Sequence, residues 1–85
     1  MVELKRWDNR EVIHSGNFKD MKELVEDACE KRIDMSFASL DRASLKGASL
    51  KGASLYRASL DYASLNGASL DDASLDEATL DGASL

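Results

Sequence analysis

Few side chains in this 85-residue chain could take part in chemistry. His14 is the single histidine and Cys29 the single cysteine, and no serine or second cysteine stands at a spacing that would pair a nucleophile with a base. The sequence also lacks a phosphate-binding glycine loop and the paired cysteine and histidine spacing of a zinc site. We therefore predict no catalytic residue, no cofactor and no metal ion, and we expect the chain not to be an enzyme.

The charge and hydropathy of the sequence limit the kinds of partner that the chain is expected to bind. The formal net charge is -5, whereas binding to nucleic acid or to an anionic membrane requires a basic patch. No apolar run approaches the roughly 20 residues that cross a bilayer. The first residues do not show the pattern of a secretory leader, so we expect none. A lone cysteine cannot form an internal disulfide. We expect a soluble, cytoplasmic protein that contacts neither nucleic acid nor membrane, and any partner attracted by charge should be basic.

Residues 33–85 can be written as consecutive groups of five. The groups read IDMSF, ASLDR, ASLKG, ASLKG, ASLYR, ASLDY, ASLNG, ASLDD, ASLDE, ATLDG and a terminal ASL. All groups but the first open with alanine and carry leucine at the third position, and the first has Ile33 and Met35 there. Residues 1–32 show no such period, so the chain divides into two parts near residue 32.

This period fits neither a helix nor a long strand. At about 100° per residue, leucines five apart would lie about 140° apart around a helix and would leave no apolar face. In a strand, the alanine and leucine of A-S-L point to one side and the serine to the other. The two remaining residues of each group are mostly good turn formers. Each group is therefore predicted to form a short strand and a corner, and the stacked groups to form a β-solenoid.

The repeats resemble the pentapeptide-repeat family, whose consensus is close to A-(D/N)-L-x-x. The resemblance implies a mainly β fold, a right-handed quadrilateral β-helix with four repeats, or about 20 residues, per coil. The serine at the second position of nearly every repeat is more uniform than in natural members, a regularity typical of an engineered or consensus-like repeat protein. The predicted solenoid core comprises Ile33, Met35, Ala38, Leu40, Leu45, Leu50, Leu55, Leu60, Leu65, Leu70, Leu75, Leu80 and Leu85.

The corner residues lead to further expectations. Glycine at the second corner position accepts the positive φ of a type II turn, whereas bulky residues favour type I. Type II turns are therefore expected at Gly47, Gly52, Gly67 and Gly82, and type I turns at Arg57, Tyr62 and Glu77. Stacking at a spacing of 20 residues places like positions in columns, with oppositely charged neighbours at Lys51 and Asp71 and at Arg57 and Glu77. It also forms a carboxylate column of Asp41, Asp61 and Asp81, which is expected to bind no metal because its oxygens do not converge.

Residues 1–32 are predicted to cover the first coil. Residues 2–14 form a β-hairpin around the turn pair Asp8-Asn9, and an amphipathic helix runs from about 18 to 31 with Asn17 as its N-cap. A similar hairpin and helix precede the repeats in some members of the family that this sequence resembles. A glycine often ends the helix there, and Arg32 occupies that place in this sequence. The apolar side of the helix is expected to pack on the solenoid through Phe18, Met21, Leu24, Val25, Ala28 and Cys29.

The end of the solenoid at residue 85 has no predicted covering element. An unpaired strand edge over an exposed core favours association, and a covered first coil excludes a head-to-tail filament. We therefore predict a homodimer that associates through Leu75, Leu80 and Leu85.

Three non-catalytic functions are compatible with this fold. The first is a structural or interaction scaffold. The second is an acidic DNA mimic that binds a topoisomerase such as DNA gyrase, a function that the family resemblance implies, and its acidic surface would be Asp61, Asp71, Asp72, Asp76, Glu77 and Asp81. The third and weakest is ice binding by the serine arrays, which charges interrupt at the corners.

Overall fold

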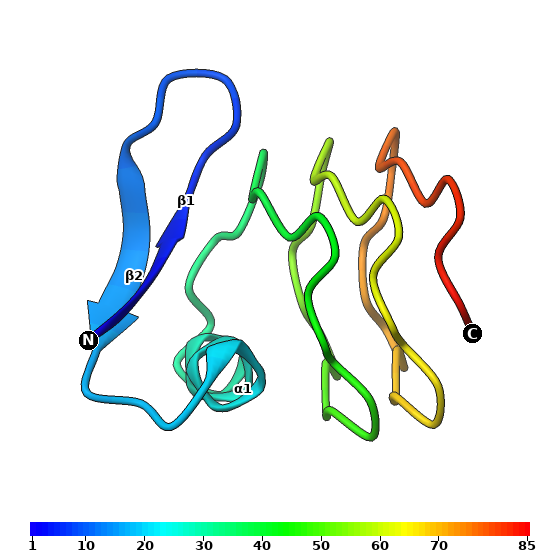
Figure 1. The fold of residues 1–85 in the computed structure, drawn as a ribbon, viewed down its shortest axis with the longest axis horizontal. Helices are drawn as coiled ribbons and strands as arrows, with labels where there is room; N and C mark the ends of the chain where they lie inside the picture. The colour runs from blue at the N-terminus through cyan, green and yellow to red at the C-terminus, as the bar shows by residue number, and fades with distance from the viewer.

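The computed structural model describes all residues, 1–85. Along the chain, a β-hairpin is followed by an α-helix and then by a series of stacked coils. The hairpin consists of strands β1 (Val2–Lys5) and β2 (Val12–Gly16), and helix α1 spans Met21–Glu30. Figure 1 shows the hairpin and α1 at one end of the molecule and the coils stacked side by side toward the C-terminus. No helix is both long and apolar enough to cross a membrane.

Residues 33–85 form a β-solenoid, which confirms the fold predicted from the repeat. Parallel bridges join residues that lie 20 apart, such as Ser39 with Ser59 and Ser44 with Ser64. From the bridge of Ser39 with Ser59 onward the backbone hydrogen bonds run both ways, as where Leu40 N–H donates to Ser59 O and Ser59 N–H donates to Ala38 O, both at 2.8 Å. One coil therefore takes 20 residues. Within each group of five, a two-residue turn follows the first three residues.

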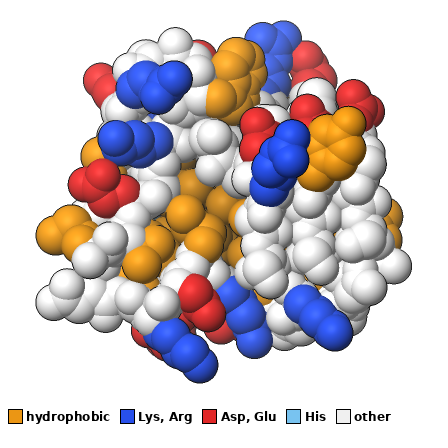
Figure 2. All heavy atoms as spheres, in the orientation of Figure 1, with side chains coloured by type: hydrophobic (Ala, Val, Ile, Leu, Met, Phe, Trp, Pro, Cys, Tyr) orange, Lys and Arg blue, Asp and Glu red, His pale blue; other side chains and the backbone are white.

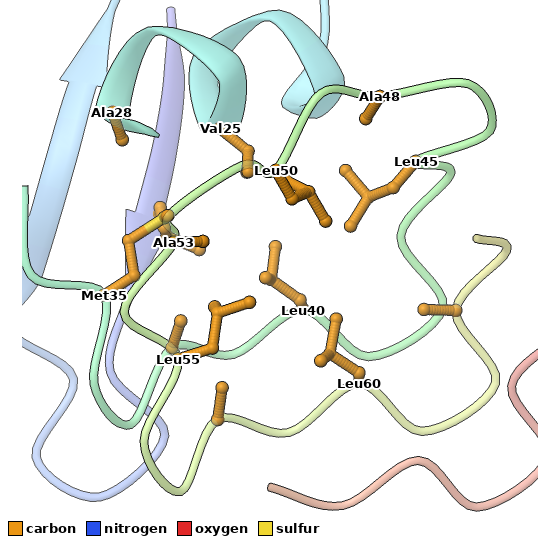
Figure 3. Packing of buried hydrophobic residues seen from close by; sticks show 14 of the residues in the cluster. Val25, Ala28, Met35, Leu40, Leu45, Ala48, Leu50, Ala53, Leu55 and Leu60 are labelled. Carbon is orange, nitrogen blue, oxygen red and sulfur yellow. The ribbon is translucent and has the colours of Figure 1, made fainter. Parts of the chain in front are cut away.

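Alanine and leucine side chains from each repeat fill the inside of the coil. The leucines at 40, 45, 50, 55 and 60 are at most 1% exposed, and they point toward one another in Figure 3. Burial decreases along the stack: Leu65 is 3% exposed, whereas Leu70, Leu75 and Leu80 are only partly buried and Leu85 is 78% exposed. The decrease has a simple cause, because side chains in the last coil have neighbours on one side only.

The turn types at the corners differ from those expected for the bulky residues. At every corner, the second residue has a positive φ, whether it is glycine or not, so the prediction of type I turns at the bulky residues is wrong. The values are close to those of the glycines, with φ of 57° at Arg57, 62° at Tyr62 and 59° at Glu77.

Hydrogen bonds between coils explain this uniformity. Type I and type II turns differ in the direction of the central peptide. In this protein the central amide of a corner donates along the stack, as where Arg57 N–H bonds to Asp76 O at 2.9 Å and Tyr62 N–H to Asp81 O at 2.8 Å. A type I corner would turn that amide away from its partner, so stacking overrides the local preference of the residue.

The hairpin forms as predicted, but its second strand runs two residues further than residue 14. Val2 pairs with Gly16 in an antiparallel ladder whose register shifts between Leu4 and Lys5. In the loop that joins the strands, the side chain of Asn9 accepts a hydrogen bond from Glu11 N–H at 2.9 Å. The side chain of Leu4 is fully buried.

The hairpin also pairs with the first coil. An antiparallel bridge joins Arg6 to Ala38, with Ser39 N–H donating to Lys5 O at 2.8 Å and Trp7 N–H donating to Phe37 O at 2.9 Å. The hairpin thus adds a strand to one wall of the solenoid and satisfies part of the edge that would otherwise face solvent.

Helix α1 is shorter than the predicted range of 18–31, and its N-cap is Asp20, not Asn17. The Asp20 carboxylate accepts a hydrogen bond from Glu23 N–H at 2.9 Å. At the other end, Arg32 N–H bonds to Cys29 O and Ile33 N–H to Ala28 O, the pattern of a Schellman motif. Arg32 holds the left-handed position of that motif, with a φ of 58°.

A side-chain hydrogen bond joins the hairpin to the helix. His14 Nε2 of β2 lies 2.8 Å from Asp27 Oδ2 of α1, and Lys31 Nζ lies 3.2 Å from the same oxygen. The hydrogen bond from His14, followed by contact with Lys31, lowers the pKa of the Asp27 carboxyl below its ordinary value. The ionised carboxylate therefore favours the folded state.

The helix end predicts a stabilising substitution. Arg32→Gly should raise the free energy of unfolding by about 0.5–1 kcal/mol, because glycine adopts a positive φ without the steric cost that other residues meet. Lys31→Gly is the matched control: Lys31 has a φ of -87°, so glycine there should lower stability. Urea denaturation of the three proteins measures the effect, and a loss of stability in both variants would contradict it.

The Asp27 ion pair predicts a dependence on pH. Because the folded-state pKa of Asp27 is lowered, its contribution is present above about pH 4 and is lost as the pH falls through the lowered value. Asp27→Asn should therefore lose less stability than the wild type between pH 5 and pH 2.5. Urea midpoints at both values measure this difference. Asp72→Asn, at a carboxylate without an ion pair, serves as the control and should follow the wild type.

Candidate functional site

The side chains with potential chemistry lie in residues 1–32. His14 is paired with Asp27, and the thiol of Cys29 is half-buried on α1, where burial raises its pKa. A thiol with a raised pKa is a poor nucleophile at neutral pH. The indole N–H of Trp7 donates to Arg57 O at 2.8 Å. The hydrogen bonds of these residues do not connect them to one another, so they do not form a common site.

Of the two predicted charge pairs, one forms. Nε and Nη2 of Arg57 lie 3.0 and 2.8 Å from Oε1 of Glu77, and this bond raises the pKa of the Arg57 guanidinium. The prediction of a pair between Lys51 and Asp71 is wrong, since no ion pair joins them. An exposed, strongly hydrated ammonium gains little from such a contact.

The carboxylates of the aspartate column turn toward neighbouring donors. Asp41 accepts a hydrogen bond from the hydroxyl of Ser59, and Asp61 Oδ1 accepts one from Asp81 N–H at 3.1 Å. No cluster of three acidic, histidine or cysteine side chains in the protein has the geometry to hold a metal ion.

Charge is distributed unevenly along the solenoid. Residues 33–57 contain four basic and two acidic side chains, whereas residues 58–85 contain six acidic side chains and no lysine or arginine. Among these six, only Glu77 has an ion-pair partner. The predicted acidic surface of Asp61, Asp71, Asp72, Asp76, Glu77 and Asp81 therefore occupies the part of the coil furthest from the hairpin. Figure 2 shows a coil wall of mostly uncharged atoms, with charged side chains along its upper and lower margins.

Helix α1 and the residues before it pack both on the core and on the hairpin. Leu24, Val25 and Ala28 are fully buried, while Phe18, Met21 and Cys29 are partly buried against the same core. Figure 3 shows Val25 and Ala28 pointing from α1 toward the inside of the first coil. The ring of Phe18 lies 5.6 Å from that of His14, so it packs against the hairpin as well.

A carboxylate of α1 also binds the coil edge. Glu26 Oε2 accepts a hydrogen bond from Ser49 N–H at 2.9 Å. Sequence reasoning did not identify Glu26, because a glutamate on the polar face of a helix carries no local signal of a distant amide. Together with the bond from Ser39 to Lys5, this contact gives partners to outward-facing amides of the first coil.

The last coil lacks such partners. Leu50 N–H and Leu55 N–H each donate to the coil that follows, but the equivalent amides of Leu70 and Leu75 have no backbone acceptor. The predicted association residues Leu75, Leu80 and Leu85 lie at this edge, where the first two are partly buried and the third is exposed. The two ends of the solenoid therefore differ in how well their backbone is satisfied.

The largest hollow, about 700 Å³, lies between α1 and the coil wall. Its only hydrophobic lining residue is Cys29, and the charged side chains around it have both signs. Such a lining supplies neither an apolar surface nor a single charge that would select a ligand. The residues that line it are Glu26, Cys29, Glu30, Arg32, Ser49, Lys51, Gly52 and Asp72.

Comparison with known proteins agrees with this geometry. A search of curated proteins found no significant match. A family model of pentapeptide repeats matches residues 31–55 and 53–85, with eight copies of the repeat. The match covers more than half of the chain and confirms the resemblance read from the A-S-L pattern. The chain therefore belongs to the pentapeptide-repeat family.

Proposed function

We propose that this protein is a non-catalytic structural and interaction module. In this proposal residues 1–32 form an N-terminal cap, and residues 33–85 form a right-handed quadrilateral β-helix that serves as a regularised, engineered or consensus-like scaffold. Two copies associate as a homodimer through the last coil. The observation that carries the proposal is the difference between the two ends of the solenoid.

The unsatisfied edge supports self-association. Amides such as Leu70 N–H and Leu75 N–H have no acceptor, and the leucines beside them are only partly buried. An edge of this kind is a template for pairing with another strand. A second copy related by a two-fold axis would present an antiparallel edge, the arrangement that the bridge between Arg6 and Ala38 already makes at the opposite end.

Charge opposes the same contact. The half of the solenoid nearest the proposed interface carries six acidic side chains and no basic ones, so two copies repel each other when salt is low. At an ionic strength of about 0.5 M, the screening length falls to a few ångströms and this repulsion is largely removed. Association should therefore become stronger as the salt concentration rises.

The dimer is tested by light scattering coupled to size-exclusion chromatography. At tens of micromolar protein, we expect a monomer in about 20 mM salt and a dimer in about 0.5 M salt. Leu85→Glu should remain monomeric in both, because it places a further carboxylate in the apolar contact beside the acidic side chains, while Leu85 is already exposed in the folded chain. Val12→Glu, at an exposed hairpin residue, is the matched control and should dimerise in high salt. A wild-type monomer in high salt would contradict the proposal.

A second candidate function is mimicry of DNA toward gyrase, which the acidic half of the solenoid favours. The net charge of the solenoid is too small for this function. Duplex DNA carries one charge per about 1.7 Å, so a rod of about 13 Å would need roughly eight net negative charges. Residues 33–85 have eight acidic and four basic side chains, which leaves half that value. A charge-steered partner of the dimer would instead be a basic protein that meets the acidic surface.

Gyrase provides a direct assay of this alternative. If the scaffold proposal holds, the protein should leave DNA supercoiling by gyrase unchanged at tens of micromolar. A variant in which Asp71 and Asp72 are both replaced by asparagine should behave in the same way. Inhibition by the wild type that disappears in this variant would instead establish mimicry through the acidic surface.

A further inference from the structure

A second hollow, distinct from the proposed dimer edge, lies beside Trp7 in the hairpin loop. Its volume is about 480 Å³, within the range of about 300–1,000 Å³ that small-molecule sites occupy. Trp7 is its single hydrophobic lining residue, and the other residues come from the wall and corners of the coil. These polar residues are Asp41, Arg57, Ser59, Glu77 and Thr79.

Trp7 is held rigidly although its side chain is 49% exposed. Its backbone N–H donates to Phe37 O at 2.9 Å, and its indole Nε1–H donates to Arg57 O at 2.8 Å. Its ring rests at a tilt against the ring of Phe37, with the ring centres 5.6 Å apart. Because the only polar atom of the indole is already bonded, the exposed part offers a fixed apolar surface to the hollow.

The polar residues of the hollow retain unused hydrogen-bonding atoms. Both bonds from Arg57 end on Oε1 of Glu77, which leaves Oε2 as a free acceptor and Nη1 of Arg57 as a free donor. The hydroxyl of Ser59 bonds to Oδ1 of Asp41, which leaves Oδ2 free. The hydroxyl of Thr79 lies 3.5 Å from that of Ser59. Two free acceptors and one free donor therefore line the hollow beside one apolar surface.

This combination selects among classes of ligand. A phosphate-bearing ligand would meet the carboxylates of Asp41 and Glu77, and a small cation would find the charge of Glu77 already offset by Arg57. A neutral sugar ring has a face of C–H groups and a rim of hydroxyls, each of which both donates and accepts. Such a ring can cover the indole surface, and its hydroxyls can bond to both the free donor and the free acceptors.

We propose that this hollow binds a neutral saccharide, with one pyranose ring stacked on Trp7 and its hydroxyls bonded to Asp41 and Glu77. The carboxylates accept hydrogen bonds from the sugar, and Arg57 donates one. The site is complete within a single chain, so it does not depend on the dimer.

Intrinsic fluorescence tests the proposal directly, because Trp7 is the only tryptophan. The probes are cellohexaose, maltohexaose and chitohexaose, with glycerol as a control for solvent effects. At least one hexasaccharide should change the emission saturably, with a dissociation constant on the order of 1 mM. Asp41→Asn should weaken that binding about ten-fold, since it removes a hydrogen bond to a charged acceptor.

Asp61→Asn is the matched control, because Asp61 occupies the next position of the same column but does not line the hollow. It should bind with unchanged affinity. The proposal is overturned if no hexasaccharide gives a saturable change, if Asp41→Asn and Asp61→Asn bind alike, or if tetramethylammonium binds and the sugars do not. Thr79→Lys gives a second check, because it fills the hollow from the exposed wall and should also abolish binding.

Discussion

The ladder of backbone hydrogen bonds between residues 20 apart is the constraint on which the rest of this structure depends. Every bridge from Asp34 with Ser54 to Ser64 with Ser84 keeps the same offset, so each repeat must have the same length and the same shape. The offset explains why alanine and leucine recur without a gap, because a single slip would turn a leucine toward solvent and a serine toward the core. It also explains the corners, where Arg57, Tyr62 and Glu77 accept a positive φ that their side chains disfavour.

A ladder of this kind must end somewhere, and its ends are the costly part of the fold. At the first coil, the hairpin supplies Lys5 O to Ser39 N–H, and the helix supplies the Glu26 carboxylate to Ser49 N–H. The same two elements bury Leu4 and Val25 over the open core. At the last coil the leucine amides and half-buried leucines remain without such cover. The proposal of self-association follows from this difference, and the unbalanced acidic charge of residues 58–85 sets its expected salt dependence.

The repeat fills the inside of the solenoid with apolar side chains, mostly alanine and leucine. The outward serines, the corner charges and the polar residues of the hairpin and helix remain exposed or partly exposed. Trp7 differs from the others because the hairpin, the first coil and the second coil all hold it in place through Phe37 and Arg57. A rigid aromatic surface beside free polar atoms is a binding feature that a uniform solenoid wall lacks.

Several features of the protein could be predicted from sequence. The five-residue period, the inward alanine and leucine, the hairpin, the amphipathic helix and the pair between Arg57 and Glu77 all depend on residue types at a regular spacing, which is visible along the chain. The helix limits were less accurate, because Asn17 and Asp20 are both acceptable N-caps and only the folded chain selects one.

The tertiary structure decided what depends on groups far apart in sequence. The type II geometry of the bulky corners, the pairing of the hairpin with residue 38, the bond from Ser49 to Glu26 and the hollow beside Trp7 all join segments that no local pattern links. The physical reason is the same in each case. The order of residues along the chain determines the five-residue period and which side chains point inward. The hydrogen-bond partners of a residue in the adjacent coil, the hairpin or the helix determine its backbone conformation.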